Sequence, residues 1–364
     1  MDMLYDYQIF SLQKFGGISR YFCELFKNFP AEHTYNLSVI FSENHYLKEN
    51  YWLLGKRNIL PEREFKGKQF LRMKLNSINQ HYSKHLISAN NFDLLHPTFY
   101  NKYFISVLRK PYIITVHDLI VFKYRNSFYK SNYILPHMEY VIKNANRIIS
   151  ISENTKRDLI EILNIDPSKI DVIYHGYNNT GLNKKTTDIG YNYILFVGLR
   201  EKYKNFTTFV KAIGNLFAKE KELKLVCIGE PFSKEELTYL LNLKILDRTI
   251  VMNADDDKLN EIYSNALMFV YPSLYEGFGM PILEAFANNC PVCLSNSSCF
   301  PEIAGKAGEY FDPDKHESIL SAIEKVLYNN SYAQELVQEG QNRLKMFSWS
   351  KTILETFNSY HKAI

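Results

Sequence analysis

Hydrophobic runs of strand length alternate with amphipathic segments of helical period along nearly the whole chain. The run at 193–200 is almost continuously apolar and precedes a turn and a helical pattern. Further strands are expected at 3–10, 35–42, 92–98, 111–120, 171–179, 223–231, 291–295 and 309–313, and within 137–152 and 249–266. Strands that alternate with helices in this way predict an α/β fold with parallel sheets.

The length of the chain suits two domains. At 364 residues it is long for a single hydrophobic core. The stretch 183–190, NKKTTDIG, has the composition of a linker. We therefore expect an N-terminal domain over 1–184 and a second domain that begins at 185.

Charge and cysteine content narrow the class of protein. Residues 1–185 contain 25 lysines and arginines against 16 acids, whereas residues 186–364 contain 18 against 23. The first domain therefore favours an anionic partner. The five cysteines form no even framework and suit buried thiols in a reducing compartment. No secretory signal opens the chain and no apolar run approaches the roughly 20 residues of a membrane span, so we expect a cytoplasmic or membrane-peripheral protein.

The segment 271–285, YPSLYEGFGMPILEA, predicts a loop, a glycine turn and a helix opened by Pro281. The unpaired amides and the dipole of such a helix attract an anion, and the glycines permit a close approach to the backbone. Glu276 before the turn and Glu284 in the first helical turn would repel an anion unless they face neutral hydroxyls. The segment suits a ligand with a diphosphate and hydroxyl-rich sugars; the alternative is an ordinary loop-to-helix turn.

This segment resembles the E-x7-E signature of the retaining glycosyltransferases of family 4, which share the GT-B fold. Glu276 and Glu284 have the separation of that signature, and the positions that fit around them are Gly277, Phe278, Gly279, Pro281 and Ala285. The resemblance implies two doubly wound Rossmann-like domains facing across a cleft. The first would bind the acceptor, the second (185–345) would bind the nucleotide sugar, and a last helix (346–364) would cross back onto the first.

Three more strings resemble motifs of the bacterial polysaccharide branch of this family. FGGISRYF (15–22) resembles the loop that faces the donor phosphate and the acceptor, and TVHDL (115–119) resembles the motif whose histidine lies near the donor sugar. VGLREKYKN (197–205) resembles the pyrophosphate-binding loop. A guanidinium and an ammonium in one loop can neutralise a leaving diphosphate.

The resemblance assigns roles to individual residues. Arg200 and Lys204 would bind the diphosphate, helped by amides near Gly16, Gly17 and Met280. Glu284 would hold the ribose hydroxyls, Glu276 the donor sugar hydroxyls, and Gly229 would lie at the nucleotide base. His117 would orient the sugar or the acceptor, with Arg20 and Asp118 on the acceptor side.

The implied reaction is transfer of a hexose, with mannose favoured, from a nucleoside diphosphate sugar to a growing, lipid-linked bacterial glycan such as O-antigen. A GDP-sugar is favoured and a UDP-sugar is the alternative. The leaving phosphate would take the acceptor proton, so neither a metal nor another cofactor is expected. Asp255, Asp256 and Asp257 are interpreted as helix caps rather than as a metal site. A nucleotide-sugar epimerase or hydrolase and a non-catalytic glycan-binding homologue remain as alternatives.

The segment 56–85 combines eight lysines and arginines with two acids and interleaved apolar residues. A basic amphipathic segment of this kind can lie on anionic lipid headgroups, and the alternative is a solvated helix face. No nucleic-acid-binding module is recognisable, so no nucleic-acid partner is expected.

Overall fold

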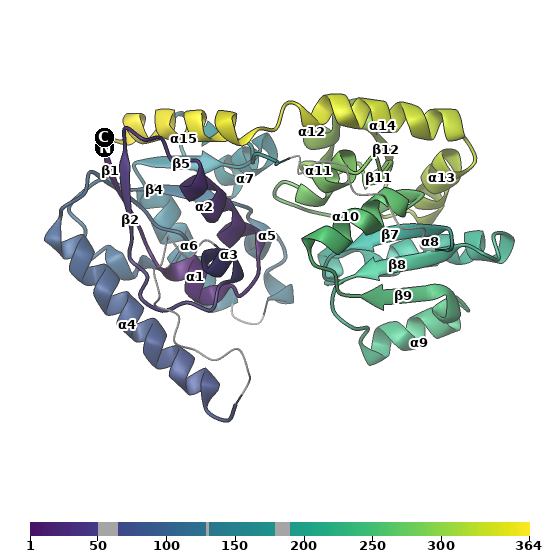
Figure 1. Ribbon diagram of the computed structural model, residues 1–364, viewed down its shortest axis with the longest axis horizontal. Helices are drawn as coiled ribbons and strands as arrows, with labels where there is room; N and C mark the ends of the chain where they lie inside the picture. The colour runs from purple at the N-terminus through teal and green to yellow at the C-terminus, as the bar shows by residue number, and fades with distance from the viewer. Residues whose placement is uncertain (50–64, 129–130, 179–189) are drawn as a thin grey trace. The chain divides into compact units, whose positions relative to one another are not determined.

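The computed structural model describes residues 1–49, 65–128, 131–178 and 190–364 (Figure 1). These residues form two compact units. Unit 1 comprises Met1–Gly176 and Ser348–Ile364, and unit 2 comprises Tyr177–Phe347. The boundary expected at 184 lies outside the described residues, and Tyr177 already belongs to unit 2.

Unit 1 is built on parallel strands in the order β2-β1-β3 and β4-β5-β6. A parallel bridge between Leu95 and Tyr112 connects β3 to the segment before β4. The strands are β1 (Asp2–Tyr5), β2 (Thr34–Leu37), β3 (Leu94–His96), β4 (Ile113–Val116), β5 (Arg147–Ser150) and β6 (Ile170–Val172). The chain runs from β1 outward to β2 and then crosses to β3, so the carboxyl end of β1 is a topological switch point.

The first strand is shorter than the predicted 3–10, because Asp6 ends it. The Asp6 carboxylate is buried and accepts hydrogen bonds from the amides of Gln8 and Thr98, at 3.3 and 2.8 Å. These bonds turn the chain into α1 instead of continuing the sheet ladder.

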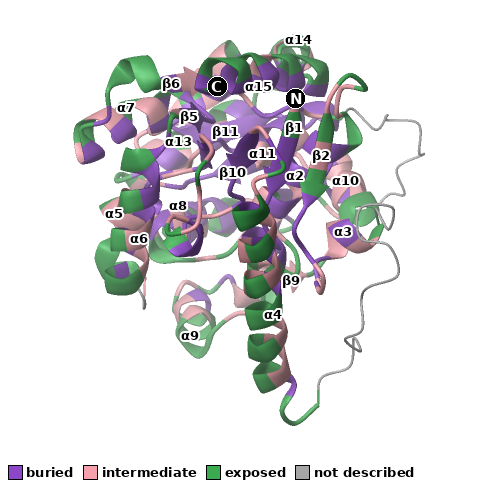
Figure 2. Ribbon diagram, turned by 90° about the vertical axis from the view of Figure 1, so that its left-hand side faces the viewer, coloured by how far each residue is buried: buried purple, intermediate pink, exposed green. Residues whose placement is uncertain are grey.

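The helices of unit 1 follow the strands and cover the sheet. They are α1 (Gln8–Leu12), α2 (Gly17–Lys27), α3 (His45–Glu49), α4 (Lys68–Ala89), α5 (Ile120–Lys123), α6 (Ser131–Asn144) and α7 (Glu153–Leu163), with short 3-10 turns η2 (Lys102–Phe104), η3 (Arg125–Ser127) and η4 (Pro167–Lys169). Figure 2 shows that much of α4 is exposed, whereas β1 and β5 are mostly buried and β2 is partly exposed.

The last helix, α15 (Trp349–Ala363), belongs to unit 1. Its Ser359 hydroxyl and Lys362 ammonium both bind the Asp171 carboxylate, each at 2.7 Å. Gly176 lies so close to Trp349 that a Cβ there would sit 2.5 Å from the Trp349 amide nitrogen. Specific polar bonds and close packing therefore hold α15 against β6 and the segment that follows β6.

Unit 2 has parallel strands in the order β12-β11-β10-β7-β8-β9. They are β7 (Tyr193–Val197), β8 (Lys224–Ile228), β9 (Thr249–Met252), β10 (Met268–Tyr271), β11 (Val292–Ser295) and β12 (Gly308–Phe311). The order reverses between β7 and β10. In doubly wound sheets, ligands bind outside the carboxyl ends of the strands at such a reversal.

The helices of unit 2 pack around this sheet. They are α8 (Phe206–Lys219), α9 (Lys234–Asn242), α10 (Asp256–Asn265), α11 (Met280–Ala287), α12 (Phe300–Ala304), α13 (His316–Leu327) and α14 (Asn330–Leu344), with 3-10 turns η5 (Lys202–Lys204), η6 (Leu246–Arg248) and η7 (Gly305–Ala307). Asp255 caps α10 by accepting the Lys258 amide at 2.9 Å, which confirms the interpretation of that acid as a helix cap.

Candidate functional site

Two oppositely charged predicted residues meet at the switch point of unit 2. Lys204 follows β7 and Glu276 follows β10, and the Lys204 Nζ lies 2.7 Å from Glu276 Oε1. Both side chains are mostly buried, at 14% and 13% exposed. The strand order thus brings a cation and a carboxylate together where a doubly wound sheet binds ligands.

The loop of Lys204 is held in place by its neighbours. The Leu274 amide donates to the Tyr203 carbonyl at 2.7 Å, which joins the loop after β10 to the loop after β7. The Asn205 side chain donates to the Pro313 carbonyl at 2.7 Å. The Lys204–Glu276 pair therefore rests on backbone that is fixed from both sides.

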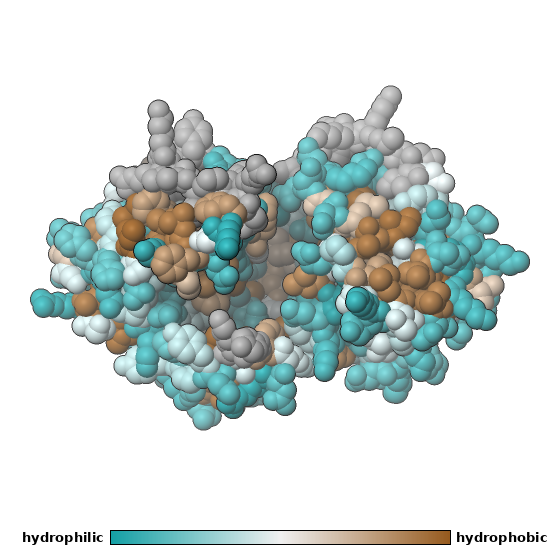
Figure 3. All heavy atoms as spheres, turned by 90° about the horizontal axis from the view of Figure 1, so that it is seen from below, coloured by the Kyte–Doolittle hydropathy of each residue, from teal (hydrophilic) through white to brown (hydrophobic). Residues whose placement is uncertain are grey.

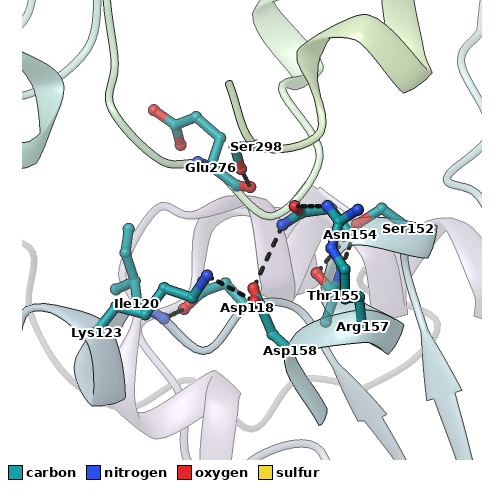
Figure 4. Close-up of polar contacts among 10 residues, drawn as sticks. All are labelled: Asp118, Ile120, Lys123, Ser152, Asn154, Thr155, Arg157, Asp158, Glu276 and Ser298. Carbon is teal, nitrogen blue, oxygen red and sulfur yellow. Dashed lines mark hydrogen bonds and ion pairs between the residues drawn. The ribbon is translucent and has the colours of Figure 1, made fainter. Parts of the chain in front are cut away.

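The backbone of Glu276 is held by two hydrogen bonds with Ser298, a residue that the sequence analysis did not predict for the site. The Glu276 amide donates to the Ser298 hydroxyl at 3.1 Å, and that hydroxyl donates to the Glu276 carbonyl at 2.6 Å. Figure 4 shows Ser298 against the Glu276 main chain, with the carboxylate directed away from it. A serine after a strand carries no motif of its own, so the sequence offered no signal for this contact.

The glycine turn and α11 complete this edge of unit 2. Gly279 has φ +90°, a conformation that favours glycine, and a Cβ there would fit tightly, 3.1 Å from Ile282 Cδ1 and 3.2 Å from Phe300 Cε1. The helix begins at Met280, one residue before the predicted start. Phe278 is buried and packs edge-on against Phe347 at 5.8 Å between ring centroids. Gly277 lies between it and Glu276.

Glu284 differs from the prediction in its position on the helix. It lies one full turn beyond Met280, so the expectation that it stands in the first turn was wrong. Its Oε2 accepts the Tyr263 hydroxyl at 3.2 Å. Burial raises the pKa of Tyr263 well above its usual value, and the Glu284 carboxylate raises it further. Tyr263 therefore stays protonated and orients this carboxylate.

Tyr271 has the same relation to Glu276. Burial raises the pKa of Tyr271 well above its usual value, with a further rise from the Glu276 carboxylate. The Lys204 Nζ also lies 5.7 Å from the centre of the Tyr271 ring. The two acids of the signature thus each have a buried, protonated tyrosine beside them.

Arg200 has partners that the sequence did not reveal. Its Nε donates to Glu236 Oε1 at 2.7 Å, and its Nη2 donates to the carbonyls of Glu230 and Pro231 at 2.6 and 2.9 Å. Its side chain is 4% exposed and lies over the Phe232 ring. Nη1 is buried and makes no hydrogen bond among the described residues. Arg200 therefore connects the loops after β7 and β8 to α9, and its Nη1 is the nitrogen that these contacts do not use.

Gly229 lies beside this leftover donor. A Cβ on Gly229 would lie 2.7 Å from the Gly198 carbonyl oxygen and 3.7 Å from Arg200 Nη1. Both glycines have positive φ, +149° for Gly229 and +126° for Gly198. The carboxyl ends of β7 and β8 therefore approach each other as only glycines allow, with Arg200 Nη1 at their edge.

In unit 1 the predicted His117 lies in a group of buried aromatic rings. It follows β4, and its ring is stacked on that of His175 with centroids 5.6 Å apart. The Tyr21 ring from α2 meets it edge-on at 5.3 Å. Burial lowers the pKa of His117 well below its usual value, and the nearby His175 lowers it further. His117 is therefore a neutral imidazole, and its buried Nε2 has no hydrogen-bond partner among the described residues.

Asp118 shapes the loop after β4. Its Oδ1 accepts the Ile120 amide at 2.9 Å, as Figure 4 shows, and so starts α5. At the other end of α5, the Lys123 Nζ lies 2.6 Å from Oδ1 of the buried Asp158 on α7. Asn154 donates to the other Asp158 oxygen at 3.3 Å. These bonds connect the loops that follow β4 and β5.

The predicted glycine loop precedes α2. Gly16 is the N-cap, and a Cβ there would lie 2.3 Å from Gln13 Oε1, which accepts the Ser19 amide at 3.2 Å. Gly17 is exposed and has open space around it. Arg20, one turn later, is partly buried, and its amide donates to the Gly16 carbonyl at 3.1 Å.

Several proteins that are similar in sequence to this chain are named for bacterial glycans. The O-antigen chain mannosyltransferase RfbU of Salmonella typhimurium is 31% identical over 215 residues, 58% of this chain and 60% of RfbU. O-antigen chain mannosyltransferase B of Escherichia coli is 26% identical over 265 residues, 68% of this chain and 69% of that protein. A Campylobacter jejuni N-acetylgalactosaminyltransferase, named for a diphospho-undecaprenol-linked acceptor, is 24% identical and covers 56% of each chain.

Solved structures share the fold at low sequence identity. Anabaena HepE, solved in complex with UDP and glucose, has a TM-score of 0.76 at 13% identity over 99% of both chains. WaaG, a glycosyltransferase involved in lipopolysaccharide biosynthesis, has a TM-score of 0.70 at 11% identity over 99% of this chain and 98% of that one. The predicted GT-B fold is confirmed.

Two family models match adjacent parts of the chain. "Glycosyltransferase Family 4" matches residues 15–180, and "Glycosyl transferases group 1" matches residues 181–343. The motifs in unit 1 and the signature in unit 2 fall inside these matches. The chain therefore belongs to glycosyltransferase family 4.

Proposed function

We propose that this protein transfers a hexose, with mannose favoured, from a nucleoside diphosphate sugar to a growing, lipid-linked bacterial surface glycan. The observation that carries the proposal is the Lys204–Glu276 pair at the switch point of unit 2, at 2.7 Å. A cation is needed for the diphosphate and a carboxylate for the sugar hydroxyls. Both are supplied here beside the start of α11.

Lys204 and Glu276 would bind different parts of the donor. The Lys204 ammonium, together with the first amides of α11, would hold the leaving diphosphate, and Arg200 Nη1 would add a second cationic donor. Glu276 would accept hydrogen bonds from the donor sugar. Glu284, oriented by Tyr263, would accept them from the ribose.

The chemical step is proposed to retain the anomeric configuration. The bond between the sugar C1 and the diphosphate oxygen breaks, and a bond from C1 to the acceptor oxygen forms on the same face. The acceptor proton passes to the leaving phosphate oxygen. Lys204 stabilises the charge that grows on that oxygen, and the step needs neither a metal nor another cofactor.

The nature of the donor is proposed from the relatives. Two relatives are named as O-antigen chain mannosyltransferases, which supports mannose as the sugar, and we propose a GDP-sugar as its donor. HepE, which shares the fold, was solved with UDP and glucose, so a UDP-sugar is the alternative.

The acceptor is proposed to meet unit 1. The Campylobacter relative is named for an acceptor linked to diphospho-undecaprenol. Residues 1–185 carry the excess of basic residues, which suits such an anion. The neutral His117 would contact the sugar or the acceptor, with Arg20 and Asp118 on the acceptor side.

We also place this protein at the cytoplasmic membrane surface. No helix among the described residues is long and apolar enough to cross a bilayer. On α4, however, Phe70 and Met73 are 58% and 60% exposed, and Lys74 lies over the Phe70 ring. Exposed apolar side chains beside cations suit an anionic headgroup layer. Residues 56–64 of the predicted membrane segment lie outside the described residues.

The test is a thermal-shift screen of GDP- and UDP-sugars, followed by NMR of the glycosylated product. Donor binding raises the unfolding temperature by mass action. We expect a shift with one class of nucleotide sugar and a product of unchanged anomeric configuration. Donor breakdown that no acceptor accelerates would favour the epimerase or hydrolase alternative, and absence of any donor binding would favour the non-catalytic one.

A further inference from the structure

A pocket of about 290 Å³ lies beside α4 in unit 1. Its walls are the end of α1 with the two residues that follow it (Phe10–Lys14), the segment Phe41–Glu43 after β2, and one face of α4 that carries Arg72, Leu75, Asn76 and Asn79. These positions on α4 are spaced by three and four residues, so they share one side of the helix. None of the residues predicted for the donor, whether in unit 2 or in the glycine loop at Gly16 and Gly17, lines this pocket.

The floor of the pocket is rigid. The Asn79 side chain is buried, and its Oδ1 accepts the amides of Ile40 and Phe41 at 2.9 and 3.0 Å. Its Nδ2 donates to the Phe41 carbonyl at 2.7 Å and to the Ser11 hydroxyl at 3.2 Å. All three walls are therefore joined through one residue, and the pocket is preformed.

The pocket carries a surplus of positive charge. Glu43 is shared by the buried Lys68, at 3.0 Å, and by Arg72, whose Nε also donates to it. Lys14 on the opposite wall is exposed. Lys14 and Arg72 line the pocket, and the buried Lys68 pairs with Glu43 without lining it, so three cations surround one carboxylate. This arrangement favours an anion.

The rim of the pocket is apolar and exposed. Leu12 lines it and is 61% exposed, and Leu75 faces it from α4. On the neighbouring flank of α4, Phe70 and Met73 extend the apolar surface outward. Figure 3, a view from below, shows hydrophobic side chains gathered among hydrophilic ones on the face of unit 1 at the left of the picture. A ligand with a charged head and a hydrocarbon chain would match both the pocket and its rim.

The pocket also adjoins the glycine loop. Gln13 lines the pocket, and its Oε1 accepts the Ser19 amide at the start of α2, beside Gly16. A ligand can therefore extend from the glycine loop into the pocket along neighbouring residues.

We propose that this pocket binds the diphosphate and first isoprene units of the lipid carrier, while the sugar end of the acceptor lies at the glycine loop. Lys14 and Arg72 would contact the diphosphate, and Leu12 and Leu75 the hydrocarbon. The proposal rests on the lipid-linked acceptor of the proposed function. It names the part of unit 1 that recognises the carrier rather than the sugar.

Calorimetric titration of the full-length protein with a long-chain polyprenyl diphosphate in neutral detergent micelles tests the proposal. The variant is Leu12→Ser with Lys14→Ala; both side chains are exposed, so the fold tolerates the changes. The matched control is Leu354→Ser with Lys351→Ala, an exposed pair on α15 in the same unit. We expect the first variant to lose about tenfold or more in affinity, since an apolar and a charged contact are both removed, and the control to bind as the unaltered protein does.

Three further probes separate the sources of binding. Inorganic diphosphate and uncharged polyprenol should each bind far more weakly than polyprenyl diphosphate, because each lacks one half of the ligand. Phosphatidylglycerol vesicles should bind both variants alike. Equal affinity of the two variants for polyprenyl diphosphate would overturn the proposal, and so would an equal loss of vesicle binding by the first variant, which would indicate a bilayer headgroup instead.

Nucleotide-sugar binding, measured by thermal shift on the same samples, separates this inference from the proposed function. Carrier binding without donor binding would support the pocket inference and contradict the proposed transferase function. Donor binding without carrier binding would contradict the pocket inference and leave the proposed transferase function supported.

Discussion

Lys204 and Glu276 form an ion pair with each other in the structure. A bound nucleotide sugar would therefore have to interact with both residues while they remain close to each other. The pair is mostly buried, and each side chain has further support, Glu276 through Ser298 and Lys204 through its loop. A supported pair of this kind is preorganised, because its side chains need little rearrangement to meet a ligand.

Replacing Lys204 by Met or Glu276 by Gln should lower kcat/KM by about 10²–10³, the usual effect of removing one group that stabilises the transition state. The matched controls are Lys219→Met and Glu324→Gln, which break a solvent-exposed ion pair of 3.0 Å in the same unit. Steady-state kinetics should show little change in these controls. Full turnover in Lys204→Met would remove the proposed role of the pair.

Arg200 offers a second test at this scale, because it has both structural contacts and a leftover donor. Arg200→Lys and Glu236→Gln should each lower the free energy of unfolding by about 1–3 kcal/mol, since both disrupt the same buried bond. Only Arg200→Lys removes Nη1, so its donor dissociation constant should rise about tenfold more than that of Glu236→Gln. Urea unfolding and donor titration measure the two effects. Equal donor affinity in both variants would make Arg200 a purely structural residue.

At the scale of elements, α4 has two differently built halves. Its second half is anchored by buried polar residues: Ser83 bonds to the hydroxyls of Ser38 and Tyr103, at 2.7 and 2.6 Å, and the Tyr103 hydroxyl donates to Asp6 at 3.1 Å. Its first half carries the exposed Phe70 and Met73. Lys68 and Arg72 pair with Glu43 in this first half, so both halves are held in place, and Phe70 and Met73 lie where these contacts leave them exposed.

Sedimentation with vesicles tests the membrane role of this helix. We expect binding to vesicles that contain anionic lipid, none to neutral vesicles, and loss of binding as salt rises, because the cationic contribution is screened. Phe70→Ser with Met73→Ser should weaken binding, since apolar insertion is lost. The control Tyr328→Ser changes a 57% exposed residue of unit 2 and should bind normally. Salt-independent binding would exclude the electrostatic contribution.

At the scale of the whole molecule, the core of unit 1 contains a chain of buried polar groups that reaches α15. The hydroxyls of Tyr5 and Tyr360 lie 2.8 Å apart, and the Tyr360 hydroxyl lies 2.8 Å from His96 Nδ1. His96 Nε2 lies 3.0 Å from the Thr115 hydroxyl. These hydrogen bonds join β1, β3, β4 and the last helix, and burial keeps His96 neutral among them.

The buried histidines predict a loss of stability in mild acid. Burial lowers the pKa of His96 and of His175 to about 3, and it lowers the pKa of His117 well below its usual value. In the unfolded chain a histidine has a pKa of about 6.5. Their contribution to stability is therefore complete above about pH 6.5 and declines as the pH falls below it. The three groups together should cost about 3–4 kcal/mol between pH 6 and pH 5.

Urea unfolding at several pH values measures this effect, and NMR of the imidazole signals assigns it. The three rings should remain neutral in the folded protein at pH 5.5. Titration of His96 near pH 6.5 in the folded state would contradict the prediction.

The alternation of strands and helices and the family were readable from the sequence. Their signals are local, because periodicity, capping residues and the E-x7-E spacing depend on residues close together in the chain. Ser152 illustrates this: serine is a common residue just before a helix, and its hydroxyl caps α7 by accepting the Thr155 amide at 3.0 Å.

Other features were decided only when distant segments met. Glu236 as the partner of Arg200, Ser298 as the grip on Glu276, and the pocket beside α4 all join loops that follow different strands. Which loops become neighbours depends on strand order and register, and neither is written in any local pattern. The early end of β1 has the same origin, because Asp6 is held by Thr98, a residue far along the chain.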